Sequence, residues 1–320
     1  MRKKVVVLGG GTGMSSLLKG LKEFPVDIVS VVSVCDDGRS TGRLREEFHI
    51  PAVGDIRKVL VSLSETEPLV EKLLNYRFET TSDLNGHTVG NLLLTAMGNM
   101  TGNMSDGIEA ISKILNLKGK ILPLTEDNVT LVGEMTDKSI VRGEHNITEC
   151  GKKIKKVYYE NTPEVNKNVL LEIKSADLII LSMGSIYTSI IPNLLCKEII
   201  SLFDSIDTKI MYVCNIMTQP GETDNLSVSE HVKIINKYLG KRKIDIVVAN
   251  NGDIKENIRK KYETLEEKDK VVLDRENLKN VELIENNYVA IENNYIRHNA
   301  LLLSLDIFKY LIDRWCRWFQ

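Results

Sequence analysis

The sequence lacks a long hydrophobic run, an excess of one charge and a dense set of cysteines. No apolar stretch approaches the roughly 18 residues that a membrane-spanning helix needs, so we expect no transmembrane segment. Lysine and arginine number 42 and aspartate and glutamate 44, so the formal net charge is −2. That balance argues against a globally basic nucleic-acid binder but leaves room for a local basic site. Apolar residues at 42% and charged residues at 27% are globular usage, which excludes whole-chain disorder or a collagen-like repeat.

The five cysteines are odd in number and widely spaced, and none forms a C-x-x-C pair. This spacing argues against a zinc site or a disulfide framework and favours the reducing cytoplasm. The basic and then apolar residues 2–8 resemble the start of a signal peptide. Their apolar part is short and leads directly into glycines, so we interpret it as a first β-strand.

Short β-branched runs alternate with helix-like runs, which predicts an α/β protein with a Rossmann-like, doubly wound, mostly parallel sheet. The expected strands are residues 4–8, 27–35, 177–181, 209–214 and 244–249, and the expected helices include 15–24, 193–204 and 227–239. Residues 119–169 alternate apolar and polar side chains between turns, which indicates a small antiparallel insertion. A last helix carries one apolar face that we expect to be core, made of Leu301, Leu302, Leu305, Phe308, Leu311 and Ile312.

A glycine-rich turn, Gly9-Gly10-Gly11-Thr12-Gly13, follows the first strand. Such a turn lets the backbone approach an anion, and the next helix presents free N–H groups and its positive dipole end. A phosphate or pyrophosphate is therefore the expected ligand. The dinucleotide fingerprint G-x-G-x-x-G is incomplete, because Met14 or Ser16 stands where the third glycine belongs, and no Walker loop is present. The alternative is a tight turn without a ligand.

The second strand leads into Asp36 and Asp37. Either carboxylate could bind a ribose hydroxyl, or the pair could hold Mg²⁺ beside a nucleotide diphosphate, and we expect no required cofactor beyond this. The arginines that follow, Arg39, Arg43 and Arg45, could pair with phosphates. The alternative is an Asx turn with a solvated basic loop.

Two further motifs have structural interpretations beside the functional ones. Asp55 and Arg57 could contact a ligand, or they could be a helix N-cap and a surface charge. His87 and Asn91, at the start of an apolar helix, could contact a phosphate and a base or sugar. A lone histidine is more often structural.

Polar residues also follow three later strands. They are Gly184, Ser185, Tyr187, Thr188 and Ser189, then Asn215, Thr218 and Gln219, then Asn250 and Asn251. Since the carboxyl ends of parallel strands meet at one edge, these residues and the glycine turn should form one polar rim, where ligands of open α/β sheets bind. We identify no catalytic residue, because no serine lies in a G-x-S-x-G elbow and no nucleophile has an evident base. The histidines are too dispersed to suggest a metal site.

Taken in order, the motifs resemble the gluconeogenesis factor family (YvcK-like), which shares the fold of 2-phospho-L-lactate transferase. The resemblance extends from Lys4 to about His298 and rests on GGGTG, CDDG before GRLR, GDIR, GHTVGN, YTSIIPNLL and NIMTQPGET. It implies a cytoplasmic regulator that binds UDP-sugars, notably UDP-N-acetylglucosamine, and supports cell shape and peptidoglycan synthesis during gluconeogenic growth.

The resemblance also implies roles for individual residues. The glycine turn, the acidic pair and residues 185–189 would contact the ligand, Tyr262 could stack on uracil, and Arg297 could pair with a pyrophosphate. The sequence departs from the family pattern at Arg39 and Asn299, which replace a glycine and an aspartate, and at Ser182-Met183, which replaces Gly-Pro. These side chains crowd two stretches expected to approach the ligand, and Asn299 removes a carboxylate.

Three functions follow from these patterns. The first is a UDP-sugar-binding regulator. The second is a phosphotransferase in which Asp36 and Asp37 place Mg²⁺ against a nucleotide diphosphate. The third is NAD(P) binding, which the incomplete glycine fingerprint disfavours. Because candidate residues occur along the whole chain, we expect residues 1–320 to form one large domain. From the charge balance, we expect no nucleic-acid partner. The sequence leaves the oligomeric state open, and a homo-oligomer is compatible with it.

Overall fold

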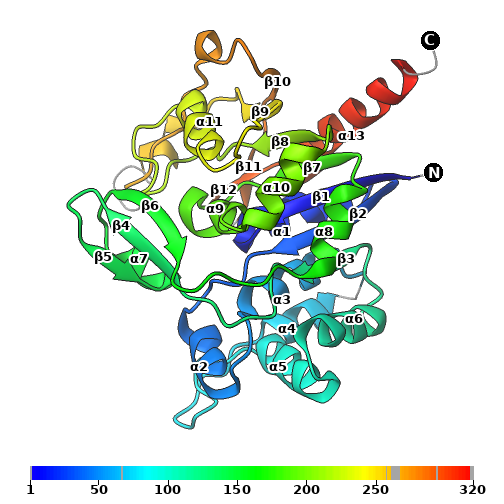
Figure 1. Cartoon of the computed structure of the whole chain (residues 1–320), viewed down its shortest axis with the longest axis vertical. Helices are drawn as coiled ribbons and strands as arrows, with labels where there is room; N and C mark the ends of the chain where they lie inside the picture. Colours follow the sequence, from blue (N-terminus) through cyan, green and yellow to red (C-terminus); the bar gives the residue numbers. More distant parts are fainter. Residues whose placement is uncertain (1, 66–67, 257, 261–266, 293–294, 318–320) are drawn as a thin grey trace.

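The computed structural model describes residues 2–65, 68–256, 258–260, 267–292 and 295–317. Its centre is a seven-stranded sheet (Figure 1). The strands are β1 (Lys3–Gly9), β2 (Val26–Val32), β3 (Lys120–Pro123), β7 (Leu178–Leu181), β8 (Lys209–Val213), β9 (Ile246–Asn250) and β10 (Glu282–Asn286). Their spatial order is β10-β9-β8-β7-β1-β2-β3, and every neighbouring pair is parallel. The predicted α/β fold is confirmed.

The strand order reverses beside β1. The chain passes from β1 to β2 and β3 on one side, returns to pair β7 with the other side of β1, and continues outward to β8, β9 and β10. In open α/β sheets, ligands bind beyond the carboxyl ends of the strands at this switch point. The loops that follow β1 and β7 are therefore the first place to look for a site.

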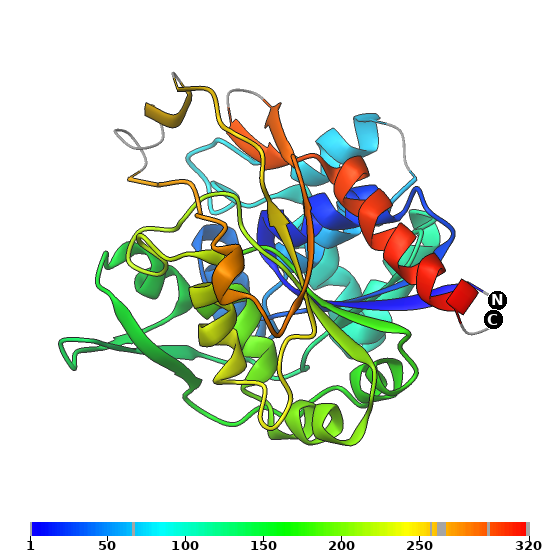
Figure 2. The same cartoon turned by 90° about the horizontal axis from the view of Figure 1, so that it is seen from above.

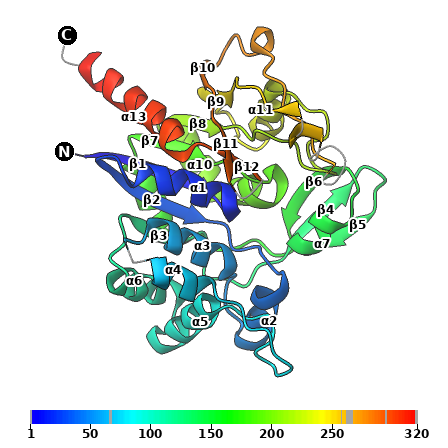
Figure 3. The ribbon, with the colours of Figure 1, turned by 180° about the vertical axis from the view of Figure 1, so that it is seen from behind.

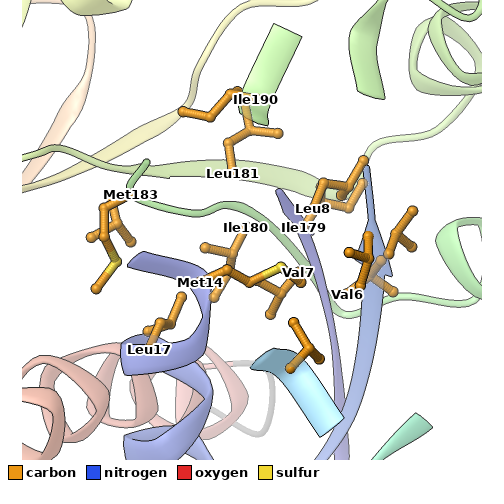
Figure 4. Close-up of a cluster of buried hydrophobic side chains, with 14 of the residues drawn as sticks. Val6, Val7, Leu8, Met14, Leu17, Ile179, Ile180, Leu181, Met183 and Ile190 are labelled. Carbon is orange, nitrogen blue, oxygen red and sulfur yellow. The ribbon is translucent and has the colours of Figure 1, made fainter. Parts of the chain in front are cut away.

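Continuous apolar sequence explains the central strands, because both faces of the sheet are covered. All of β7 and β9 and the last five residues of β1 are buried. Figure 4 shows side chains of β1 and β7, such as Val7 and Ile180, beside Met14 and Leu17 of the first helix. This packing fixes the start of that helix against the two strands of the switch point.

Helices flank both faces of the sheet, as Figure 2 shows for the red α13 and the green α10. The longer helices are α1 (Gly11–Leu21), α2 (Arg39–Phe48), α3 (Gly54–Leu63), α4 (Pro68–Asn75), α5 (Val89–Thr101), α6 (Met104–Ile114), α8 (Lys167–Lys174), α10 (Lys197–Ser205), α11 (Val228–Asn236) and α13 (Ala300–Arg317). Shorter elements are the π-helical segment η1 (Ile186–Ile190), α9 (Ile191–Leu194), the 3-10 turn η2 (Arg275–Asn277), and the hairpin of β11 (Val289–Glu292) and β12 (Tyr295–His298). The second strand of this hairpin, β12, ends one residue before α13 begins.

The antiparallel insertion is present but begins later than predicted. It contains β4 (Leu131–Met135), β5 (Ile140–Arg142), α7 (Glu144–Glu149) and β6 (Ile154–Tyr159), with strand order β5-β4-β6. The preceding strand, β3, pairs in parallel with β2 and is an edge of the main sheet. Its four residues were too few to reveal a continuous apolar run. In Figure 3 the insertion lies at the opposite end of the molecule from the N-terminus, beside the carboxyl ends of the central strands.

Several predicted helix details are wrong. The first helix starts at Gly11 rather than Ser15, and the helix expected over 193–204 is divided between α9 and α10. On α13, Leu301 is 58% and Ile312 is 38% exposed, whereas Leu303 and Ile307 are fully buried. The helix is apolar around much of its circumference, so its buried face could not be read from spacing alone.

No single described helix is long and apolar enough to cross a membrane. The bent pair Ile186–Leu194 and Lys197–Ser205 meets the length and composition criteria only when its two parts are combined, with a bend of 68°.

Candidate functional site

The loops after β1 and β7 contact each other through their backbones at the switch point. A side chain at Gly13 would overlap the Met183 carbonyl, and a Cβ at Gly184 would lie 3.6 Å from the Gly10 carbonyl oxygen. Glycine is therefore needed at position 13 for the two loops to meet, whether or not a ligand binds between them, whereas the contact at Gly184 is an ordinary one.

The N–H of Gly11, the first residue of α1, already has a hydrogen-bond partner within the chain. The Gly11 N–H donates to Asp55 Oδ2 at 2.7 Å, and the other oxygen of Asp55 pairs with Lys58 Nζ at 2.8 Å. The N-cap interpretation of Asp55 is wrong, because Val53 holds that position in α3. Asp55 instead joins α3 to the glycine turn.

A pocket of about 190 Å³ opens beside this turn, between the loops of β7 and β8 and strand β12. Of the residues singled out in the sequence, it brings together Thr12, Gly13, Gly184, Asn215, Thr218, Gln219 and Arg297. Lys268 also lines it and was not predicted, because nothing in its local sequence distinguishes it from other lysines. The pocket thus combines helix N–H groups, amides and two cationic side chains, which suits a phosphorylated ligand.

Hydrogen bonds fix the pocket wall. The Asn215 amide accepts from the Gly184 N–H at 2.9 Å and donates to the Gly184 carbonyl at 2.7 Å. The Thr218 hydroxyl accepts from the Asp269 N–H at 2.8 Å. The buried Gln219 Oε1, by contrast, has no hydrogen-bond partner in the described part of the chain. The fold thus leaves this acceptor without a partner, on a side chain that lines the pocket.

His298 also lines the pocket, and its imidazole is neutral. Its Nε2 lies 3.1 Å from the Cys214 carbonyl oxygen, so this nitrogen carries the proton. Burial lowers the pKa of His298 to about 4. A neutral buried imidazole contributes shape and one hydrogen bond rather than positive charge.

Four carboxylates lie on the other side of the glycine turn. We call Asp36, Asp37, Asp55 and Glu144 the acidic wall, and each is half-buried. Asp36 accepts hydrogen bonds from the Gly38 N–H at 3.0 Å and the Thr41 hydroxyl at 2.9 Å. Burial and then the nearby charge of Asp55 raise the pKa of Asp36.

Glu144 reaches the wall from the insertion, as the first residue of α7. Burial, followed by the charge of Asp36, raises the pKa of Glu144 to about 7, and its carboxyl hydrogen-bonds with the Thr188 hydroxyl. Asp37 accepts from the His145 N–H at 2.8 Å, next along the same helix. The described side chains contain no group of three or more His, Cys, Asp or Glu arranged to hold a metal ion. Magnesium at Asp36 and Asp37 stays a prediction, in which phosphate oxygens would complete the coordination.

A buried glutamate controls the Ser185–Ser189 segment. Ser185 Oγ donates to the Glu222 carboxylate at 2.6 Å and accepts from the Thr188 N–H at 2.9 Å. The N–H groups of Ile186 and Tyr187 also bond Glu222, and burial raises the pKa of that carboxyl to about 7. The first donors of η1 are therefore used internally. This hydroxyl–carboxylate pair could not be predicted from local pattern, because Glu222 is distant from Ser185 in the chain.

Three other predicted residues lie away from the pocket, where they join α2 to α5 and α3 to α4. His87 Nδ1 lies 2.9 Å from Ser40 Oγ, and Asn91 donates to the same hydroxyl at 3.2 Å. Arg57 is only 8% exposed and donates to Asn75 at 2.5 Å, so its interpretation as a surface charge is wrong.

The arginines of the first basic loop also have partners within the chain. Arg43 donates to the carbonyl oxygens of Asp83 and Asn85. Arg45 is buried and binds carbonyls, including that of Asp36 at 3.0 Å, rather than facing solvent. Tyr262 lies outside the described residues.

The three departures from the family pattern have distinct structural consequences. Arg39 has φ +42°, in the left-handed region that favours glycine. Ser182 is fully buried, and its hydroxyl has no partner among the residues described. Asn299 Oδ1 accepts from the Leu302 N–H at 3.1 Å and caps α13, a role for which asparagine and aspartate are about equally suited.

Comparison with known proteins agrees with the fold and the motif order. Residues 5–289 match the family model described as 2-phospho-L-lactate transferase CofD. The gluconeogenesis factors of Bacillus subtilis and Halalkalibacterium halodurans are 46% and 44% identical, over 93% and 95% of this chain and 95% of each relative. A crystal structure of a Bacillus halodurans protein superimposes with a TM-score of 0.92 at 43% identity, covering 96% of this chain and 100% of that one. The chain therefore belongs to the CofD family, in the branch of the gluconeogenesis factors.

Proposed function

We propose that this chain is a cytoplasmic regulator that binds UDP-sugars, with UDP-N-acetylglucosamine as the principal ligand, and that supports cell shape and peptidoglycan synthesis during gluconeogenic growth. The observation that carries the proposal is the pocket at the switch point, where the glycine turn meets Lys268 and Arg297. A diphosphate carries the charge that these groups neutralise. The uridine and the sugar that the diphosphate carries would then extend to either side of the glycine turn.

The unpaired acceptor of Gln219 supports a uracil on the pocket side. Uracil carries an N–H donor, and a buried acceptor without a partner costs about 1–3 kcal/mol until such a donor arrives. Asn215 and Thr218 hold the adjoining backbone in place. Stacking of Tyr262 on the base remains a prediction from the resemblance.

Ligand-dependent thermal stability tests the proposal. UDP-N-acetylglucosamine at 100 times its Kd should stabilise the protein by roughly 2.7 kcal/mol. Arg297→Ala should abolish most of the shift, whereas Arg2→Ala should not, because Arg2 precedes β1 at the opposite end of the sheet. The absence of a shift for the folded wild-type protein at millimolar ligand would refute the proposal.

The acidic wall favours one alternative, a Mg²⁺-dependent phosphotransferase that acts on a nucleotide diphosphate substrate. Asp36 and Asp37 would hold the ion, which would neutralise charge that develops on the transferred group. This activity would release a nucleotide monophosphate, require Mg²⁺, and disappear in Asp37→Asn. A fluorescence titration with NADH tests the third function, NAD(P) binding, in the same preparations.

A further inference from the structure

The loop after β8 contains a tight turn that carries both a pocket residue and a buried carboxylate. The turn extends from Gln219 to Thr223, and the Gln219 N–H donates to the Thr223 hydroxyl at 2.9 Å. The N–H groups of Glu222 and Thr223 both donate to the Gln219 carbonyl, at 3.1 and 2.9 Å. Because these bonds close the turn, a shift of the buried Glu222 also shifts Gln219, which lines the pocket.

Glu222 connects this turn to the loop of β7, which forms the adjoining wall of the pocket. The Ser185 hydroxyl donates to the carboxylate at 2.6 Å, and Ser185 directly follows Gly184, a pocket residue. The first two N–H groups of η1 donate to the same carboxylate. Asn215 already joins the two loops at Gly184. Glu222 is thus a second connection between the two walls, and one that can change its charge.

The hydrogen-bond partners of Glu222 match its ionised form. All of them donate, since they are one hydroxyl and two backbone N–H groups. Hydrogen bonds to a carboxylate are charge-assisted and roughly twice as strong as bonds between neutral groups. A protonated Glu222 could give its proton to Ser185 Oγ but to neither N–H, and the Ser185 hydroxyl would have to turn its own hydrogen away. Ser185 Oγ also accepts from the Thr188 N–H at 2.9 Å. Protonation therefore weakens the connection between the two walls.

The surroundings of Glu222 place its change of charge near neutral pH. Burial raises the pKa of Glu222 to about 7, and the negative charge of Asp224 in the same loop acts in the same direction. Tyr187 of η1 also faces the carboxylate, but burial raises the pKa of this phenol to about 12, so it stays neutral. Lys152 of the insertion approaches the turn through its backbone, whereas its ammonium pairs with Asp137 at 2.8 Å. The ionised fraction of Glu222 therefore changes most between pH 6 and 8.

We propose that Glu222 is a positioning residue that makes ligand binding depend on pH: its ionised form holds the β7 and β8 loops at the separation that the ligand requires, and its protonated form loosens them. The inference rests on the proposed function and adds a regulation of that site. Protonation of other groups, including Glu144, makes the protein more positive and favours an anionic ligand. A loss of affinity on acidification through Glu222 has the opposite sign, so the two effects can be told apart.

Calorimetric titration with UDP-N-acetylglucosamine at pH 6 and pH 8 tests this inference. Both phosphates of this ligand are esterified on two sides, so it lacks the phosphate ionisation near pH 6. The ratio of the Kd at pH 6 to that at pH 8 should be at least about threefold larger in the wild type than in Glu222→Gln, which cannot ionise. Binding to the ionised form alone would give about tenfold. Glu198→Gln, at an exposed position of α10, should keep the wild-type ratio. Equal ratios in the wild type and Glu222→Gln would overturn the inference.

A second measurement does not need the Glu222 variant to fold. Glu144→Gln removes the other carboxyl of the site whose pKa is about 7. In this variant, titration at pH 7 in two buffers of different ionisation enthalpy should show that binding releases a fraction of a proton, because the ligand favours the ionised Glu222. Proton uptake, or no exchange of protons, would overturn the inference. Failure of the folded wild type to bind the ligand at either pH would instead refute the proposed function.

Discussion

Glu222 allows the energetics of the site to be tested without a ligand. The side chain is 6% exposed and holds Ser185 together with the first N–H groups of η1. Glu222→Gln keeps the size of the side chain and an acceptor oxygen but removes the titratable proton. The comparison of wild type with this variant therefore isolates the free energy of ionising one buried carboxyl.

The magnitude follows from the pKa of Glu222, which burial raises from 4.5 to about 7. The folded state then keeps a proton that the unfolded state loses, so this contribution to stability is complete below pH 4.5 and is lost as pH rises to 7. A difference of about 2.5 pKa units corresponds to about 3 kcal/mol. The free energy of unfolding of the wild type should fall by that amount relative to the variant between pH 4.5 and 8.

Urea unfolding of both proteins at several pH values from 5 to 8 measures this difference, and most of the fall should occur within that range. Other titrating groups, including His298, cancel in the comparison because both proteins contain them. Glu198→Gln makes the same substitution at an exposed glutamate of α10 and is the matched control for the change of residue itself. A pH-independent difference for Glu222→Gln would refute the assigned environment of this carboxyl.

Two further predictions concern the departures from the family pattern. Arg39→Gly should stabilise the protein by about 0.5–1 kcal/mol, because it relieves the left-handed backbone while adding freedom to the unfolded chain, and chemical denaturation should detect the gain. A loss of stability would show that the arginine side chain contributes more than its backbone conformation costs. Ser182→Ala should stabilise the protein by about 1 kcal/mol by removing a buried hydroxyl without a partner, and a destabilised variant in the same assay would mean that the hydroxyl is satisfied in solution.

The sequence predicted the features that depend on local pattern. β1 and β7 are continuous apolar runs because both faces of the sheet are covered, and the glycine turn follows β1 as expected. The polar rim could be predicted because parallel strands end at a common edge. These features need only the sequence near each strand.

The contacts that define the site electrostatics could not be predicted. Glu222 meets Ser185, and Glu144 meets Thr188, only after separate loops and the insertion have folded against η1. Arg45 also looked like a ligand-binding arginine, since its sequence position cannot show that it points inward to backbone carbonyls. Such pairings depend on tertiary placement rather than on spacing along the chain.

The packing of α13 against α1 holds the two sides of the pocket in place relative to each other. Arg297 lies in β12, directly before α13, while the glycine turn begins α1, and a side chain at Gly20 would overlap the Ala300 carbonyl where the helices meet. Gly20 is about 13 Å along the helix from Gly11. A substitution there would push the helices apart and move Arg297 relative to the glycine turn. If the proposed function holds, position 20 is constrained by the geometry of a ligand that it never touches, and variation there would act on binding from a distance.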